Sequence, residues 1–429
     1  MSPTARRIWP AAALAGAALV LPSAALHAAE DSVRRAEQLS DGVEVTLETY
    51  PADGRHLLLW TAPGYGFREG HREMAARLAA RGMEIWQADL NEALFLARGS
   101  PAMRRLDGRY VADLVERAHA ATGKRIALMS GSYGAIPVLR GARQWQLRGP
   151  EKPYLIGAVL FSPNVYTTIP SLGLEPEYLP IARATNIPVM VFQGGTNANR
   201  WQVPKLLAAL RSGGSPAYVQ ILPGIVDLFY EPQRPQAVQA QLAQLPRRLE
   251  RVLPLLEKAG TPLQAVPMQA PVIGEGRGLD AELKPFRGDP RPPAIRLPDA
   301  RGRLHEVEGY RGRVTVVNFW ATWCPPCVAE IPSLNRLRRA MADEPFVLIS
   351  INYAEPAEVI RAFMDEVEVD YPVLIDEDGR VAARWGVLVF PSTFVIGPGG
   401  AIRYGVNAAI RWDAPPVIAA LRRLAEKAP

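Results

Sequence analysis

The sequence predicts an α/β protein with two folded domains, of which the first is a parallel sheet with flanking helices. Two observations support this prediction. Short apolar runs alternate with amphipathic stretches along residues 30–265, which is the pattern of strands connected by helices. A segment rich in proline and glycine, residues 261–293, then separates this part from a second one. The 429 residues are 48% hydrophobic, so each part can bury a core.

The N-terminal residues 1–29 have the features of a secretory signal peptide. Arg6 and Arg7 are followed by an apolar run from Ala11 to Leu21 and then by small residues up to Ala29. This run is shorter than the roughly 20 residues that span a membrane. We therefore expect export to a bacterial periplasm, with an uncleaved signal that anchors the protein to the membrane as the alternative.

We divide the rest of the chain into a first domain at 30–265, a linker at 266–290 and a second domain at 291–429. The strands expected in the first domain are His56–Thr61, Glu84–Ala88, Arg125–Ser130, Leu155–Ser162, Pro188–Gln193 and Ala217–Leu222. The helices expected between and after them are Glu69–Arg81, Arg109–Thr122, Pro204–Ser212 and Gln236–Lys258.

Ser132 lies in the motif Ser130-Gly131-Ser132-Tyr133-Gly134, between an expected strand and a helical run. This motif resembles the nucleophile elbow of α/β-hydrolases, Gly-x-Ser-x-Gly, with Ser130 in place of the first glycine. The segment Ala62–Phe67 resembles the oxyanion loop of the same family, with Pro63-Gly64 in place of His-Gly. The resemblance covers roughly residues 42–260 and implies an α/β-hydrolase-like domain.

The residues that activate such a serine are missing from their expected positions. A serine hydroxyl becomes a good nucleophile when a neighbouring base takes its proton. In α/β-hydrolases the acid and the histidine follow the serine in the chain, on later loops. Here the first of these loops carries Asn197, and the second, residues 222–229, contains no histidine. We therefore expect a degenerate domain that docks a partner, with Ser132 marking a residual hydrolase site.

Three histidines precede Ser132 in the first domain. His71 follows the oxyanion-like loop and is the candidate to approach Ser132, although an exposed position in the first turn of a helix is the simpler interpretation. His56 at the start of a strand and His119 on a helix are expected to be structural.

The two cysteines of the chain, Cys324 and Cys327, form a Cys-Pro-Pro-Cys motif. The motif follows a buried-strand pattern at Val314–Phe319 and precedes a helical run at Val328–Ala340, an arrangement typical of a redox-active dithiol. The i, i+3 spacing places both sulfurs on one helix face, and the helix N-terminus favours a Cys324 thiolate. No metal site is expected, because the sequence offers no second Cys or His pair to complete one. A purely structural disulfide is not expected, because a bond that closes so small a loop would add little stability.

The segment Asn318–Cys327 resembles the active-site motif of TlpA/ResA/CcmG-type periplasmic thioredoxins, and the similarity extends over about Pro292–Ala428. The resemblance implies a thioredoxin fold. It also implies that Glu330 is the active-site carboxylate and shuttles the proton of Cys327, with an ordinary acidic residue near a helix start as the alternative.

The same resemblance places a cis-proline, Pro391, beside the dithiol. It identifies Trp323 and Phe390, together with Pro391, as the residues that contact substrate. Phe390 is bulkier than the residue usually found before this proline, so a difference in partner fit is expected. The elements that it implies are a hairpin beginning near Pro293, a strand at Phe346–Asn352 and a helix at Ala357–Val367.

These residues predict a thiol-disulfide oxidoreductase. Cys324 attacks a substrate disulfide and Cys327 resolves the mixed disulfide, so the pair is itself the redox centre and no other cofactor is expected. The resemblance implies a reductase that takes electrons from a membrane thiol-electron transporter and passes them to thiol/disulfide proteins, such as apocytochrome c or copper-site proteins. The net charge of +6, with both signs plentiful, gives no indication of nucleic-acid binding. The alternatives are a bifunctional protein with an active Ser132 hydrolase and a redox-sensing binding protein.

Overall fold

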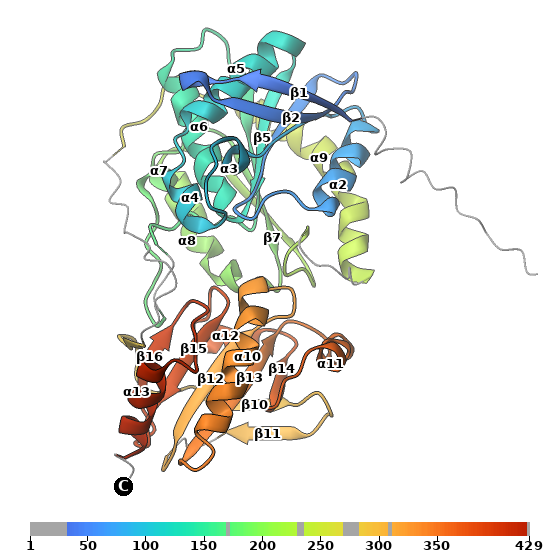
Figure 1. The fold of residues 1–429 in the computed structure, drawn as a ribbon. Coiled ribbons are helices and arrows are strands. Elements are labelled where there is room, and N and C mark those ends of the chain that lie inside the picture. The colour runs from blue at the N-terminus through green and yellow to red at the C-terminus, as the bar shows by residue number, and fades with distance from the viewer. Residues whose placement is uncertain (1–31, 169–171, 230–235, 269–282, 308–310, 427–429) are drawn as a thin grey trace, which may run out of the picture.

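The computed structural model describes residues 32–168, 172–229, 236–268, 283–307 and 311–426. The predicted signal peptide and most of the predicted linker therefore lie outside the described residues. The described chain forms two α/β domains, each built on one large β-sheet (Figure 1). No helix within these ranges is long and apolar enough to cross a membrane.

The first domain contains an eight-stranded sheet in the order β1-β2-β4-β3-β5-β6-β7-β8. Strands β3 to β8 pair in parallel, whereas β1 and β2 form an antiparallel edge. The strands are β1 Val33–Gln38, β2 Glu44–Tyr50, β3 His56–Thr61, β4 Glu84–Ala88, β5 Arg125–Gly131, β6 Leu155–Phe161, β7 Val189–Gly194 and β8 Ala217–Leu222. This large parallel sheet confirms the predicted α/β class.

Helices cover both faces of the first sheet (Figure 1). Helices α5, α6 and α8 pack on one face, and α2 and α9 pack on the other. The helices are α2 Glu69–Ala79, α3 Leu90–Ala93, α4 Ser100–Arg105, α5 Arg109–Thr122, α6 Ala135–Leu147, α7 Pro180–Arg183, α8 Val203–Ser212 and α9 Gln236–Ala259. Strands such as β6 are buried along their whole length, because helices cover both sides of the sheet. Because such strands are buried at every position, they consist of short apolar runs, and these runs made them recognisable in the sequence.

The two edge strands carry a weaker signal than the central ones. Strand β1 reads Val-Arg-Arg-Ala-Glu-Gln and has no buried residue, so no apolar run marks it. Strand β2 alternates between exposed and buried positions because helices cover only part of it. Neither strand was therefore among those expected from the sequence.

The second domain contains a six-stranded sheet in the order β14-β13-β12-β15-β16-β9. The central strand β12 pairs in parallel with β13, which pairs in parallel with β14, whereas β15, β16 and β9 continue the sheet in antiparallel fashion. The strands are β9 Lys284–Pro285, β12 Val314–Trp320, β13 Phe346–Tyr353, β14 Val373–Asp376, β15 Ser392–Ile396 and β16 Ile402–Val406. Strand β9 lies in the segment that the sequence predicted as linker, 266–290, and it pairs with β16 of the second sheet.

The helices of the second domain complete a thioredoxin fold. They are α10 Pro325–Ala340, α11 Ala357–Glu366, α12 Arg380–Arg384 and α13 Pro415–Ala425. Helix α10 connects the parallel strands β12 and β13, and it packs with α13 on one face of the sheet. A hairpin of β10 (Ile295–Pro298) and β11 (Leu304–Val307) lies beside β14. The thioredoxin fold expected for this part of the chain is confirmed.

The two domains share an apolar contact at one edge of the second sheet. Ala198 and Val226 of the first domain belong to the same buried cluster as Trp385 of the second. The Tyr353 hydroxyl, at the end of β13, donates a hydrogen bond to the Thr196 carbonyl. Because β12 and β13 are parallel and in register, the carboxyl end of β12 lies at this same edge. The end of the second domain that carries the cysteines therefore faces the first domain (Figure 1).

Candidate active site

The two cysteines lie where β12 ends and α10 begins. Cys324 is the residue that precedes α10, and its carbonyl accepts a hydrogen bond from the Cys327 amide at 3.0 Å. The cysteines form a disulfide, with their Cα atoms 5.3 Å apart. Cys324 is 4% exposed and Cys327 is fully buried. Of the two sulfurs, that of Cys324 is therefore the one within reach of a substrate.

The residues expected to contact substrate lie together beside the disulfide. The peptide bond between Phe390 and Pro391 is cis. The next residue, Ser392, pairs with Phe319 of β12, which brings this loop next to the start of α10. The rings of Trp323 and Phe390 meet edge to face with centroids 5.9 Å apart, and both side chains are half-buried. The structure thus brings Trp323, Phe390 and Pro391 together at the disulfide.

Glu330 lies inside the protein, one turn after Cys327 on the same helix. Its carboxylate accepts hydrogen bonds from the Asn318 amide at 2.8 Å and from the Trp412 indole at 3.1 Å. Asn318 also donates to the Thr393 hydroxyl at 2.9 Å, so these hydrogen bonds tie α10 to β12 and β15. Burial raises the pKa of Glu330 to about 8, although the two hydrogen bonds favour the charged form.

The raised pKa gives Glu330 a specific chemical capacity. A free cysteine thiol has a pKa of about 8.5, so carboxyl and thiol have similar proton affinities. Proton transfer by a general acid or base is most effective when its pKa lies near the working pH. The i, i+3 spacing places Glu330 and Cys327 on the same face of α10. Glu330 is therefore suited to exchanging a proton with the buried Cys327 sulfur.

A second buried carboxylate, Glu355, supports the loop before the cysteines. It accepts hydrogen bonds from the backbone amide and the hydroxyl of Thr322 and from the Asn352 amide. Burial is the main cause that raises the pKa of Glu355. The sequence did not single out this residue, because it lies 31 positions from Cys324 and no motif includes it. An acidic residue two positions after the end of a buried strand is the one signal that was available.

Ser132 lies on a sharp turn between β5 and α6. Its backbone has a φ of +50°, a left-handed conformation that is rare for a residue other than glycine. A nucleophile elbow has this strand–turn–helix geometry. The Ser132 hydroxyl accepts a hydrogen bond from the Asn164 amide at 3.2 Å, and its carbonyl accepts one from the Asn164 backbone. An amide donor cannot remove the proton that a serine nucleophile must lose.

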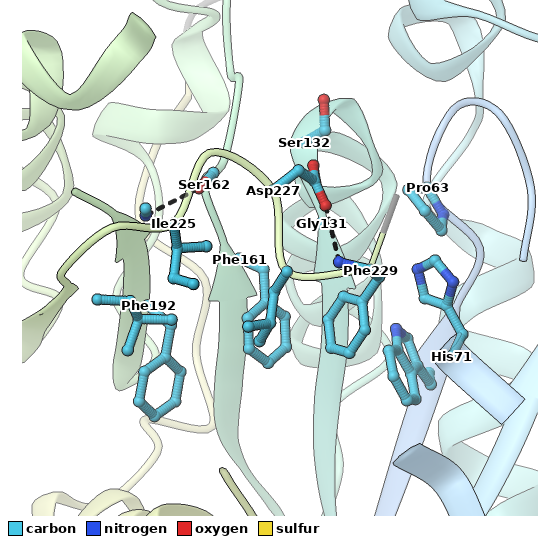
Figure 2. Close-up of a pocket in the computed structure, with 14 residues that line it drawn as sticks. Pro63, His71, Gly131, Ser132, Phe161, Ser162, Phe192, Ile225, Asp227 and Phe229 are labelled. Carbon is cyan, nitrogen blue, oxygen red and sulfur yellow. Dashed lines mark hydrogen bonds between the residues drawn. The ribbon is translucent and has the colours of Figure 1, made fainter. Parts of the chain in front are cut away.

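The pocket beneath Ser132 is filled by aromatic side chains (Figure 2). Phe161, Phe192 and Phe229 line it together with Trp60. Its free volume is about 20 Å³, which is room for about one water molecule. Pockets that bind small molecules usually enclose about 300–1,000 Å³.

His71 lines the same pocket but does not lie on the surface. The prediction of an exposed position in the first helical turn is wrong, since His71 is only 1% exposed. Its ring stacks on Phe229 with centroids 4.7 Å apart (Figure 2). Its Nδ1 atom accepts a hydrogen bond from the Arg68 amide at 2.9 Å, at the start of α2. The aromatic neighbours explain the burial, because a ring that caps a helix and stacks on Phe229 leaves little surface to solvent.

The two loops that carry the acid and the base in a serine hydrolase serve local structure here. The Asn197 side chain accepts a hydrogen bond from the Asn199 amide and donates one to the Val226 carbonyl. In the other loop, Asp227 accepts a hydrogen bond from the Phe229 amide (Figure 2). In the part of the chain that the structure describes, no group of three or more His, Cys, Asp or Glu is placed to hold a metal ion.

Comparison with known proteins relates the second domain to a defined class. Residues 289–405 match the model of the AhpC/TSA family. The chain is 32% identical over 111 residues to the thiol-disulfide oxidoreductase ResA of Geobacillus thermodenitrificans, which covers 26% of this chain and 64% of that protein. It is 32% identical over 114 residues to the thioredoxin-like protein YneN of Bacillus subtilis, which covers 26% of this chain and 66% of that protein.

Among solved structures, StoA from Bacillus subtilis is 19% identical, with coverage of 32% of this chain and 98% of StoA and a TM-score of 0.27. A thiol-disulfide oxidoreductase from Bacteroides fragilis is 22% identical, with coverage of 31% and 98% and a TM-score of 0.27. The matched region of this chain is similar to proteins named thiol-disulfide oxidoreductase and thioredoxin-like protein. The chain spans just under two thirds of the length of the two curated relatives.

Proposed function

We propose that this protein is a periplasmic thiol-disulfide oxidoreductase that reduces disulfides of other proteins through Cys324 and Cys327. One observation carries the proposal: the disulfide at the start of α10 lies one helical turn from a buried carboxyl group, Glu330, with a pKa raised to about 8. A purely structural disulfide has no need of a proton-exchanging group with this pKa. The names of the curated relatives support the same chemistry.

The reaction proceeds by two exchanges of a sulfur–sulfur bond. The Cys324 thiolate attacks one sulfur of the substrate disulfide, and the other substrate sulfur leaves as a thiolate. In the fraction of molecules in which Glu330 is ionised, the Cys327 thiol gives its proton to the Glu330 carboxylate, and the Cys327 thiolate then attacks the Cys324 sulfur. This step releases the second substrate thiolate and leaves the Cys324–Cys327 disulfide, so two electrons pass from the protein to the substrate. Both substrate thiolates take up protons, and an external dithiol restores the reduced protein.

The direction, the partners and the role of the first domain belong to the same proposal. We expect a membrane thiol-electron transporter to supply the electrons, and thiol/disulfide proteins such as apocytochrome c or copper-site proteins to receive them. The first domain docks a partner and does not hydrolyse one. Two observations support the absence of hydrolysis. The pocket under Ser132 holds about one water molecule, and the Ser132 hydroxyl accepts a hydrogen bond from the Asn164 amide.

Variants of the two cysteines test the chemistry. With dithiothreitol as reductant, the wild-type protein should accelerate the reduction of insulin, and Cys324→Ser should abolish the acceleration. Cys327→Ser should accumulate a mixed disulfide at Cys324, seen as added mass that dithiothreitol removes. Full activity in Cys324→Ser would refute the proposal.

The reduction potential tests the direction. A reductase should equilibrate with glutathione at a potential more negative than about −220 mV, because its dithiol must lose electrons readily. A potential well above this value would instead indicate an oxidase. A redox-sensing protein is distinguished by slow exchange, since its dithiol would equilibrate without accelerating insulin reduction.

A further inference from the structure

A groove of about 600 Å³ lies where the two domains meet. Its walls are Leu174, Glu175 and Trp201 from the first domain and Arg380, Arg384 and Leu388 from the second. Leu388 is three residues before the cis-proline Pro391, so the groove begins about 10 Å of chain from the disulfide site. The groove therefore lies close along the chain to the loop proposed to contact the substrate.

The first domain contributes uncovered apolar side chains to this groove. Trp201 is 55% exposed and Leu174 is 43% exposed, although both are large hydrophobic residues. The Arg200 guanidinium lies over the Trp201 ring, 4.2 Å from its centroid, and holds one face of that ring in place. Exposed aromatic side chains set in a concave surface are the usual anchors of protein interfaces.

The charge of the groove is positive. Arg384 is exposed and contacts the Ala294 carbonyl at 3.4 Å, and it forms no salt bridge with any carboxylate of the described chain. Arg380 pairs with Asp378 at 3.2 Å. The acidic lining residue Glu175 is neutralised by Lys205 at 2.5 Å, which also lowers the pKa of Glu175. Among the described residues, Arg384 thus lacks a salt bridge, although it also attracts the Asp376 carboxyl, and it is a cation of the groove that an acidic partner can pair with.

The two walls are held in a fixed relation. Helix α12, which carries Arg380 and Arg384, packs against the segment Ala198–Gln202 that carries Trp201. The hydrogen bond from Tyr353 to the Thr196 carbonyl joins the domains a few residues away. The groove is therefore a feature of the two-domain unit, and neither domain alone would form it.

We propose that this groove binds an extended, acidic segment of the substrate protein, with an apolar side chain against Trp201 and a carboxylate against Arg384. The segment lies on the same chain as the disulfide that Cys324 attacks, within a few residues of it. This inference rests on the proposed function and gives the first domain its role in choosing substrates. The groove binds without covalent chemistry, and the disulfide exchange remains that of Cys324 and Cys327.

Two peptides test the proposal with the full-length protein. Each carries one cysteine in a mixed disulfide with thionitrobenzoate, and the residues beside it are either acidic or basic around a common leucine. In single turnovers with pre-reduced protein, release of coloured thionitrobenzoate reports the attack by Cys324. We expect the acidic peptide to react with a kcat/KM at least about threefold higher than the basic one. The difference should lie in a lower KM for the acidic peptide.

The variants separate the groove from the chemistry. Arg384→Glu should abolish or reverse the preference, and Trp201→Ala should raise KM for both peptides. Arg423→Glu, an exposed arginine on α13, is the matched control and should keep the preference. Arg423→Glu should also reduce free dithionitrobenzoate at the wild-type rate. An unchanged preference in Arg384→Glu, or an equal loss in Arg423→Glu, would overturn the inference.

Binding to the oxidised protein keeps the two proposals apart. The fluorescence anisotropy of a labelled acidic peptide without cysteine should rise with wild-type protein and not with Arg384→Glu. If no disulfide is reduced but this binding is seen, the proposed function fails and the groove stands. If disulfides are reduced without binding or preference, the groove proposal fails alone.

Discussion

The hydroxyl of Tyr353, in the thioredoxin-fold domain, donates a hydrogen bond to the backbone carbonyl of Thr196 in the first domain. The Tyr353 ring also packs on Phe390, with centroids 4.7 Å apart, and Phe390 contacts Trp323 beside the disulfide. A continuous line of contacts thus runs from the first domain to the residues proposed to contact the substrate. One hydrogen bond and two ring contacts therefore connect the first domain to the loop beside the disulfide.

Removing the Tyr353 hydroxyl should loosen the loop that it holds. Tyr353→Phe keeps the ring on Phe390 and deletes a hydrogen bond that is worth about 0.5–1.5 kcal/mol. We expect amide hydrogen exchange in residues 196–202 to become about two- to twelvefold faster, because the loop opens more often. Tyr404→Phe, a half-buried tyrosine on β16, is the control and should leave this exchange unchanged. Equal exchange in both variants would contradict the link.

The raised pKa of Glu330 should make stability depend on pH. The folded protein keeps this carboxyl protonated up to about pH 8, whereas the unfolded chain ionises near its ordinary value of 4.5. Between these values the folded state holds the extra proton, so the contribution of Glu330 to stability falls as pH rises and levels off above about pH 8. The slope from one such group is at most about 1.4 kcal/mol per pH unit.

Urea unfolding of the oxidised protein at pH 5, 6.5 and 8 would measure this effect. Glu330→Gln should make the fall smaller, because an amide does not titrate in this range, whereas Glu355 and Asp376, whose pKa values burial also raises, still contribute. Glu377→Gln replaces an exposed carboxylate of the same domain and should retain the fall. The same pH dependence in wild type and Glu330→Gln would show that Glu330 does not contribute to the fall.

Glu355 should be needed for the shape of the loop before Cys324. In Glu355→Ala the amide of Thr322 and the side-chain amide of Asn352 lose their acceptor inside the protein. An unsatisfied buried polar group costs about 1–3 kcal/mol, so the free energy of unfolding should fall by at least that amount. Glu358→Ala removes an exposed carboxylate of α11 and should change it by less than about 0.5 kcal/mol. A loss no larger than this control's would refute the role.

Ser132 should not behave as an activated nucleophile. A fluorophosphonate probe reacts with serine hydrolases through their activated hydroxyl, and the Ser132 hydroxyl instead accepts a hydrogen bond from Asn164. We expect the intact mass of the wild-type protein to stay unchanged while a serine hydrolase in the same tube is labelled. Labelling that disappears in Ser132→Ala would establish the bifunctional alternative.

The sequence was most informative where the signal is local. Strands such as β3 and β6 are short apolar runs, and β12, Cys324 and α10 follow one another within a few residues. In a Cys-x-x-Cys motif at a helix start, the relative positions of the two cysteines are set locally, because hydrogen bonds within one helical turn hold them. The proximity of the two sulfurs was accordingly predictable, and the thioredoxin fold was implied by the resemblance of the segment Asn318–Cys327.

Contacts between distant residues were not predictable in this way. His71 looked like an exposed helix residue, but the aromatic rings that bury it come from β3 and from the loop after β8. Glu355 reaches Thr322 across 33 positions, and no spacing in the sequence connects them. In both cases the partner is chosen by the packing of separate elements.

The sequence by itself therefore determined the fold class, the dithiol and the missing hydrolase residues, because each depends on residue identity and on spacing within one or two elements. The tertiary structure decided the pKa of Glu330, the burial of His71, the contact of Tyr353 with Thr196 and the groove between the domains. Each of these depends on how far a side chain is removed from water and on which distant segment covers it. Those quantities exist only once both domains have folded and packed together.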